Sequence, residues 1–219
     1  MVKMKYKAVF WDIDGTMYDN SGGIPENERD VLSFDRPLSK VPKGLKYWVP
    51  YHRLADLMRQ IPKDRQGVIS NGYDQLQRDK LRLLGLDAYI NPNLIFTSYG
   101  EAEKILNNPD HPLLSCAGSD PEYYMHNLTQ KTQKPELYMF QRALDETGFS
   151  AEECVMIGDG WQDLVGARNA GMQTIYIGTT KHLPWDERKT LLKVLRNSRF
   201  KPDYKIKKGD IEALTRLLI

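Results

Sequence analysis

Short apolar runs alternate with longer amphipathic stretches along almost the whole chain, and this alternation constrains the fold more than any other feature. Parallel strands need a crossover connection, which is usually a helix. We therefore expect an α/β fold with three layers, in which helices cover both faces of a doubly wound, Rossmann-like parallel sheet. The predicted strands are 6–11, 67–70, 94–97, 154–157, 174–177 and 203–206, and the predicted helices are 51–61, 73–84, 101–107, 135–147, 162–170 and 210–218.

Two stretches interrupt the alternation. Residues 17–50 have weak periodicity and begin rich in Gly, Pro, Asn and Ser, and residues 107–133 look like a long irregular segment. Long loops inside a compact domain are usually functional or disordered. We predict a core domain made of residues 1–16 and 51–219, a small cap or lid at 17–50, and a second loop insertion within the core at 107–133.

Composition excludes some classes of partner. The 31 Lys and Arg against 29 Asp and Glu give a net charge of +2, which provides no broad electrostatic case for nucleic acid or a membrane. We interpret the basic segment 181–208 as a solvated face. The N-terminus lacks the apolar region of a signal peptide, and no stretch approaches the roughly 18 apolar residues of a membrane span. With only Cys116 and Cys154 present, we expect a cytoplasmic protein in a reducing compartment.

Polar residues follow the predicted strands at the points where these strands end. In a doubly wound sheet the ligand binds beyond the carboxyl ends of the strands, so these residues are expected to share one crevice. Four carboxylates in such a place repel one another, and a hard cation with oxygen ligands, Mg²⁺, would relieve the repulsion. The residues are Asp12 and Asp14 in DIDGT, Ser70, Asn71 and Gly72 in VISNG, and Asp159 and Asp163 in GDGWQD.

The two aspartates of DIDGT suit different tasks. We expect Asp12 to be a nucleophile and a metal ligand, because reaction through an aspartyl-phosphate divides one difficult displacement into two easier ones. Asp14 would act as general acid and base and would offer its backbone carbonyl to the metal. A turn at Gly15 would let both carboxylates face one substrate; the alternative is that Asp14 and Gly15 only form a turn.

Four motifs in this order resemble the haloacid dehalogenase (HAD) superfamily of phosphohydrolases, and the resemblance covers nearly the whole chain. They are DIDGT, the Ser70 of VISNG, the Lys134 of QKPELYMFQRAL, and GDGWQD with Asp159 and Asp163. The resemblance implies that Ser70 and the amides near Asn71 and Gly72 hold the transferring phosphoryl group. It also implies that Lys134 contacts this group and the nucleophile, and that Asp12, Asp14, Asp159 and Asp163 serve the metal.

Some assignments stay open in the sequence. Lys104 follows a place where the family can also present its lysine, although the KPELYMF context favours Lys134. Asp163 would also suit the first turn of a helix, where a carboxylate is stabilised by the helix dipole. Ser70 and Asn71 would also suit the cap of the next helix.

The resemblance implies a Mg²⁺-dependent phosphatase with a reduced cap, since Asp14 favours phosphoryl chemistry over carbon–halogen hydrolysis. The expected partner is a small-molecule phosphomonoester, such as a nucleotide, a sugar phosphate or another organophosphate. A small lid cannot enclose a substrate from all sides, so the further expectation is either an exposed substrate such as a macromolecule or a homo-oligomer that completes the lid. The alternatives are a phosphomutase of the same superfamily and a non-catalytic binding protein on this scaffold.

Overall fold

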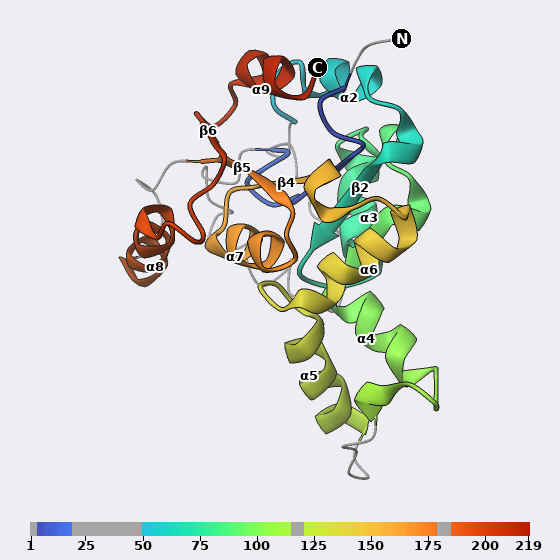
Figure 1. The fold of residues 1–219 in the computed structure, drawn as a ribbon. Helices are drawn as coiled ribbons and strands as arrows, with labels where there is room; N and C mark the ends of the chain where they lie inside the picture. The colour runs from blue at the N-terminus through green and yellow to red at the C-terminus, as the bar shows by residue number, and fades with distance from the viewer. Residues whose placement is uncertain (1–3, 19–49, 115–120, 179–184) are drawn as a thin grey trace, which may run out of the picture.

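The computed structural model describes residues 4–18, 50–114, 121–178 and 185–219. Within these ranges all the strands are parallel and form one sheet in the order β3-β2-β1-β4-β5-β6 (Figure 1). From the central strand β1 the chain passes first to one side of the sheet and later to the other, which confirms the predicted doubly wound topology. The strands are β1 (Ala8–Trp11), β2 (Gln66–Ser70), β3 (Ile95–Thr97), β4 (Cys154–Gly158), β5 (Gln173–Ile177) and β6 (Tyr204–Ile206).

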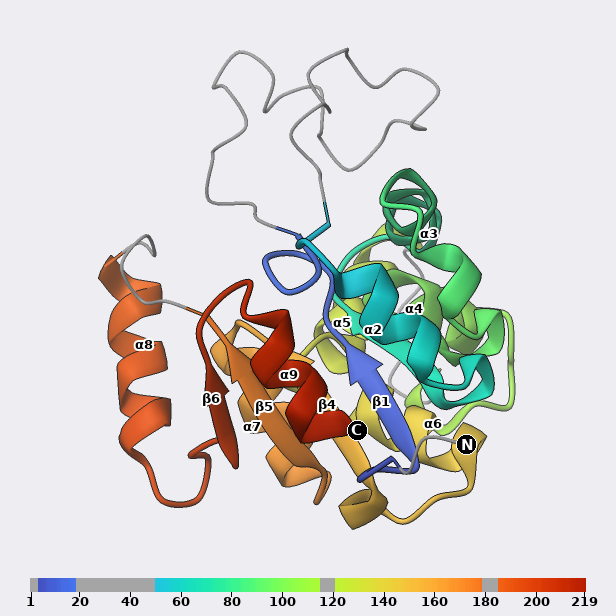
Figure 2. The same ribbon diagram turned by 90° about the horizontal axis from the view of Figure 1, so that it is seen from above.

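Helices cover both faces of the sheet and complete the three predicted layers. Seen from above, α2 and α9 lie on one face, and α6 and α7 lie on the other (Figure 2). No helix in the described ranges is both long enough and apolar enough to cross a membrane. The helices are α2 (Leu54–Gln60), α3 (Asp74–Leu83), α4 (Ser98–Leu106), α5 (Pro121–Thr132), α6 (Leu137–Thr147), α7 (Trp161–Asn169), α8 (Trp185–Arg196) and α9 (Ile211–Leu218).

Strand β1 shows how the sequence divides the core between these two faces. Successive side chains of a strand point to opposite faces. Val9 and Trp11 pack in the cluster that contains α2 and α9, whereas Ala8 and Phe10 pack in the cluster that contains α6 and α7. All four are fully buried, as is the free thiol of Cys154 in β4. A strand buried on both faces appears in the sequence as one continuous apolar run, which is why β1 could be predicted from the sequence.

The prediction of an irregular segment at 107–133 is wrong for its second half. Residues Pro121–Thr132 form α5, which packs against α4, and the two helices extend side by side away from the sheet (Figure 1). Ala102 and Ile105 of α4 and Leu128 of α5 form a small buried cluster between them. The assignment of 107–133 as a second insertion stays a prediction.

The predicted cap at 17–50 lies outside the described residues except at its two ends. Met17 and Tyr18 are buried, and Tyr18 forms an antiparallel bridge with Pro50. The chain therefore leaves the core and returns to it at one place, beside the end of β1.

The basic segment at 181–208 contains a helix that the sequence analysis did not predict. Lys189 and Lys193 of α8 are exposed, in agreement with a solvated face. The opposite face of α8 is buried, because Leu191 and Val194 pack against Tyr176 of β5 and α7. These two apolar residues, three positions apart, are the helical signal in the sequence.

The contact between α7 and α6 provides a test of the core. A Cβ atom on Gly166 would lie 2.1 Å from a ring carbon of Phe140. Gly166→Ala should therefore lower the free energy of unfolding by about 1–3 kcal/mol through overpacking. Denaturant titration would measure this loss, and the double variant with Phe140→Leu should recover part of it. A Gly166→Ala protein as stable as the wild type would contradict this packing.

Candidate active site

The carboxyl ends of three neighbouring strands meet at a pocket of about 260 Å³. Asp12 follows β1 directly and its amide donates to the carbonyl of Ile157 in β4 at 2.9 Å. Ser70 ends β2 on one side of β1, and Asp159 follows β4 on the other side. The pocket is lined by Asp12, Asp14, Ser70, Asn71, Lys134, Asp159, Gly160, Trp161, Gln162, Asp163, Glu187 and Leu191.

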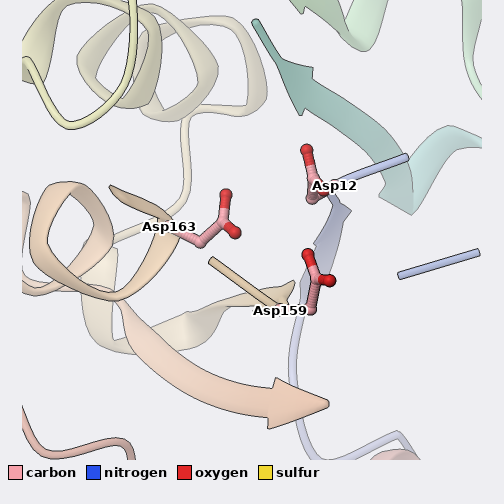
Figure 3. Close-up of side chains that lie close together, drawn as sticks. All are labelled: Asp12, Asp159 and Asp163. Carbon is pink, nitrogen blue, oxygen red and sulfur yellow. The ribbon is translucent and has the colours of Figure 1, made fainter. Parts of the chain in front are cut away.

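Three carboxylates converge in this pocket. Asp12, Asp159 and Asp163 each place an oxygen within 4.8 Å of the other two. Figure 3 shows the three side chains approaching from the end of β1, the end of β4 and the first turn of α7. Asp12 and Asp163 are buried. A set of oxygen donors at this spacing fits a hard divalent cation such as Mg²⁺.

Lys134 reaches the same point from the segment that precedes α6. Its Nζ lies 2.6 Å from Asp12 Oδ1, 2.6 Å from Asp163 Oδ1 and 3.2 Å from the carbonyl of Ile69. Its backbone amide donates to Asn71 Oδ1 at 2.8 Å. Burial opposes the charged form of Lys134, but Asp12 and Asp163 outweigh burial and raise its pKa above the ordinary value. The ammonium group is therefore a fixed positive charge in the pocket.

Two of the aspartates in the pocket have pKa values above the ordinary range. Burial raises the pKa of Asp12 to about 7, although Lys134 acts in the opposite direction. Burial and the neighbouring Asp12 and Asp163 also raise the pKa of Asp159 well above its usual range. One lysine is thus not enough to balance these carboxylates, and a divalent cation would favour their ionised forms.

Two glycines make the close approach of the acids possible. A Cβ on Gly15 would lie 2.1 Å from Asp159 Oδ2, and the φ of Gly15 is +81°, where other residues are strained. A Cβ on Gly158 would lie 2.4 Å from Asp163 Cγ. The glycines of the motifs DIDGT and GDGWQD therefore leave room for carboxylates that come from another strand or turn.

Both carboxylate oxygens of Asp163 accept hydrogen bonds. Oδ1 accepts from Lys134, and Oδ2 accepts from the amide of Gly160 at 2.9 Å, at the start of α7. The two interpretations of the sequence are therefore compatible, because one side chain caps the helix, holds the lysine and belongs to the acidic cluster.

Asp14 also lies at the pocket, but its carboxylate is outside the acidic cluster of Asp12, Asp159 and Asp163. Both of its oxygens are 2.8 Å from Lys80 Nζ, and the Tyr18 hydroxyl donates to Oδ1. Burial alone would raise the pKa of Asp14, but Lys80 and Tyr18 outweigh burial and lower it. Lys80 from α3 thus favours the ionised form of the side chain that was predicted as acid and base, which is the form that accepts a proton.

The residues that follow β2 are only partly available to a ligand. Ser70 Oγ lies in the pocket, 3.4 Å from Asp12 Oδ1. Asn71 also lines the pocket, and its carbonyl accepts from Gln77 Nε2 at 2.6 Å. The amide of Gly72 donates instead to Ser98 Oγ at 2.9 Å, and Gly72 is not part of the pocket lining. The structure therefore brings Ser70 and Asn71 to the site and turns the Gly72 amide to another partner.

Lys104, the alternative lysine, lies elsewhere. It is on α4, where its Nζ is 2.5 Å from Glu101 Oε1 and the side chain is 59% exposed. The geometry therefore favours Lys134, whose side chain is only 5% exposed.

The sequence analysis missed two contributors to the site. Glu187 and Leu191 of α8 form one wall of the pocket, beside Trp161. Lys80 of α3 pairs with Asp14. The helical spacing of apolar residues in α8 was a usable signal for the wall. Nothing in the local sequence around Lys80 indicates its partner, which is 66 positions away.

The raised pKa of Asp12 leads to a test with divalent ions removed. The folded protein holds this proton more tightly than the unfolded chain, whose value is about 3.8. The stability that the group contributes is therefore complete below about pH 4 and lost as the pH rises to about 7. Asn cannot ionise, so the stability of Asp12→Asn relative to the wild type should increase as the pH rises through this range. Denaturant titration across this range would measure it.

Mg²⁺ provides the control for this experiment. Because the cation favours the ionised form of Asp12, adding it should reduce the difference between the two proteins near neutral pH. A difference in stability that did not change between pH 4 and pH 7 would contradict the buried, raised-pKa state of Asp12.

Comparisons with known proteins find similarity to hydrolases. The HAD-hydrolase-like family model matches residues 132–207. The chain is 24% identical to a glyceraldehyde 3-phosphate phosphatase from Methanothermobacter thermautotrophicus, over 79% of this chain and 86% of the relative. It is 26% identical to a 5'-nucleotidase from Pseudomonas aeruginosa, over 80% of this chain and 84% of the relative.

A solved structure is similar to this chain in fold. A HAD-hydrolase from Bacillus subtilis bound to magnesium superposes with a TM-score of 0.56 and 17% identity, covering 98% of this chain and 99% of that chain. The family model, the curated relatives and the six-stranded parallel sheet all indicate that this chain is similar to hydrolases of the haloacid dehalogenase superfamily.

Proposed function

We propose that this protein is a Mg²⁺-dependent phosphatase that hydrolyses a small phosphomonoester through a phosphoryl intermediate on Asp12. The observation that carries the proposal is the position of Asp12, which lines the pocket, pairs with Lys134 at 2.6 Å and places an oxygen within 4.8 Å of one of Asp159. The names of the two curated relatives, a glyceraldehyde 3-phosphate phosphatase and a 5'-nucleotidase, support hydrolysis of a phosphoric monoester.

The balance of charge supports one divalent cation. Five carboxylates line the pocket: four aspartates and, on the α8 wall, the exposed Glu187. Two lysines, Lys134 and Lys80, form ion pairs with three of the aspartates. The four aspartates and these two lysines leave a formal charge of −2, which one Mg²⁺ would neutralise. We assign Asp12 and Asp159 as carboxylate ligands, with the backbone carbonyl of Asp14 beside them. When bound, the cation would offset the negative charge of the phosphoryl oxygens.

In the first step an Asp12 oxygen attacks the phosphorus of the ester. The bond between phosphorus and the ester oxygen breaks, and protonated Asp14 donates its proton to that oxygen, which leaves as an alcohol. Lys134 stays in contact with Asp12 and stabilises charge on the transferring group. Ser70 Oγ, beside Asp12, donates a hydrogen bond to a phosphoryl oxygen.

In the second step water attacks the phosphorus of phosphorylated Asp12. The water gives a proton to the Asp14 carboxylate, the bond between phosphorus and Asp12 breaks, and inorganic phosphate leaves. Asp12 is regenerated, and Asp14 holds the proton that the next alcohol needs. The described residues thus account for every proton in the cycle.

Asp163 and Asn71 have supporting roles in this proposal. Asp163 fixes the ammonium group of Lys134 and the turn at Gly160, and lies at the edge of the cation site. Asn71 fixes the backbone of Lys134. Because the Gly72 amide is committed to Ser98, we assign substrate contact to Ser70, Asn71 and Lys134.

The pocket indicates a substrate of limited size. Its volume of about 260 Å³ accommodates a phosphoryl group and a small organic part, and Trp161 and Leu191 provide apolar contacts on one side. The remaining wall would come from the predicted cap at 17–50 or from a second copy of the chain. The proposal includes this wall, from either of the two sources, and a cytoplasmic location of the protein.

Phosphate release tests the function. The purified protein with Mg²⁺ should release phosphate from a panel of nucleotides, sugar phosphates and small organophosphates, and EDTA should abolish release. Asp12→Asn removes the nucleophile, so the rate should fall by more than about 10³-fold, the largest loss that removal of one stabilising donor causes. The exposed Asp145→Asn on α6 is the matched control and should retain full activity.

The outcomes separate the alternatives. Free phosphate identifies a phosphatase, whereas an isomerised sugar phosphate without free phosphate would identify a phosphomutase. Full activity in Asp12→Asn, or no release of phosphate across the panel, would contradict the proposal.

A further inference from the structure

The carboxylate of Asp14 accepts hydrogen bonds from α3 and from Tyr18. Lys80 Nζ of α3 lies 2.8 Å from each of its oxygens, and the Tyr18 hydroxyl donates to Oδ1. Gln77, one turn before Lys80 on α3, places Nε2 3.5 Å from Oδ2. The side chain of Lys80 is 10% exposed and that of Asp14 is 37% exposed, so the lysine is buried while the carboxylate is partly open to the pocket.

Lys80 is a lysine in a buried position. Its residue is 8% exposed, and lysine is almost never fully buried unless it is paired. Replacing a buried ion pair by apolar residues is often neutral or stabilising. A lysine here therefore has a consequence for Asp14 that an apolar residue would not have.

That consequence concerns the nearby cation site. Asp14 lies two residues from Asp12, yet its carboxylate is outside the cluster of oxygens of Asp12, Asp159 and Asp163. An unrestrained carboxylate so close to a divalent cation would be attracted to it as an additional ligand. The ion pair with Lys80 occupies both oxygens and holds the carboxylate away from the cluster.

We propose that Lys80 is a positioning residue that keeps the Asp14 carboxylate off the cation and in place as the base for hydrolysis of phosphorylated Asp12. This inference rests on the proposed function. In the step concerned, water forms a bond to phosphorus, its proton passes to Asp14, and the bond between phosphorus and Asp12 breaks to release phosphate. Lys80 contacts neither the water nor the phosphoryl group in this scheme and acts only through Asp14.

Lys80→Met is the main test, and Lys104→Met is the matched control. Both lysines project from helices and pair with a carboxylate, but the partner of Lys104 is Glu101, which is not in the pocket lining. Lys80→Met removes the charge and keeps a side chain of similar length. Circular dichroism and thermal melting check the fold, and Lys80→Gln replaces Lys80→Met if the latter does not fold.

Pre-steady-state kinetics with p-nitrophenyl phosphate separate the two half-reactions. Its leaving group needs little help from an acid, so formation of phosphorylated Asp12 should be almost unaffected by Lys80→Met. Breakdown of this intermediate should slow by about 10²-fold, a typical contribution of a general base. We expect a burst of about one nitrophenol per enzyme, a kcat lower by about 10²-fold, and kcat/KM within about threefold of wild type.

The kinetic outcomes are decisive in both directions. Lys80→Arg should recover most of kcat, since the arginine fork can pair with both carboxylate oxygens, and Lys104→Met should behave as wild type. Equal losses in kcat and kcat/KM without a burst would overturn the proposal, because they indicate a general structural effect. A kcat of wild-type size in Lys80→Met would also overturn it.

Binding of Mg²⁺ measured by calorimetry tests the proposal without any turnover. Lys80→Met should bind Mg²⁺ about tenfold more tightly, because a charge is lost and Asp14 is freed as a ligand. In an Asp14→Asn background the same substitution should tighten binding by about threefold at most, since only the charge effect remains. Equal effects in both backgrounds would overturn the positioning role.

The two experiments also distinguish failure of this inference from failure of the proposed function. A wild-type protein that releases no phosphate would refute the phosphatase proposal. The Mg²⁺ measurements would still decide whether Lys80 restrains Asp14.

Discussion

The site depends on the crowding of carboxylates at the carboxyl ends of adjacent strands, with one buried ammonium group between them. Lys134 bridges Asp12 and Asp163 at 2.6 Å, while Asp159 has no comparable partner among the described residues. The crowding raises the pKa values of Asp12 and Asp159, and it is geometrically possible only because Gly15 and Gly158 leave space. Sheet order and glycine placement thus produce one arrangement of carboxylates, whose repulsion a cation would relieve.

Much of the fold and of the site could be predicted from the sequence, because both depend on local patterns. Strands buried on both faces read as apolar runs, and the residues that terminate them lie at one edge when the sheet is parallel. The sequence therefore predicts that Asp12, Ser70 and Asp159 lie together, and all three line the pocket. Lys134 was less local, and only its motif favoured it over Lys104, which pairs with Glu101 on α4.

The remaining features depend on contacts between residues far apart in the sequence. The segment of α8 was interpreted from its charges, although Leu191 and Val194 are buried and the helix forms a wall of the pocket. The ion pair of Lys80 with Asp14 has no signature in composition or periodicity. The Gly72 amide, expected at the phosphoryl group, bonds Ser98 of α4, a partner that only the packing of α4 determines.

The antiparallel bridge between Tyr18 and Pro50 has a consequence for how such a chain can diversify. Since the excursion starts and finishes at neighbouring backbone positions, inserts of different length can be exchanged there with only a small change in closure entropy. Tyr18, at the foot of the insert, also bonds Asp14. A new insert would therefore begin directly beside Asp14 without disturbing the sheet beneath it.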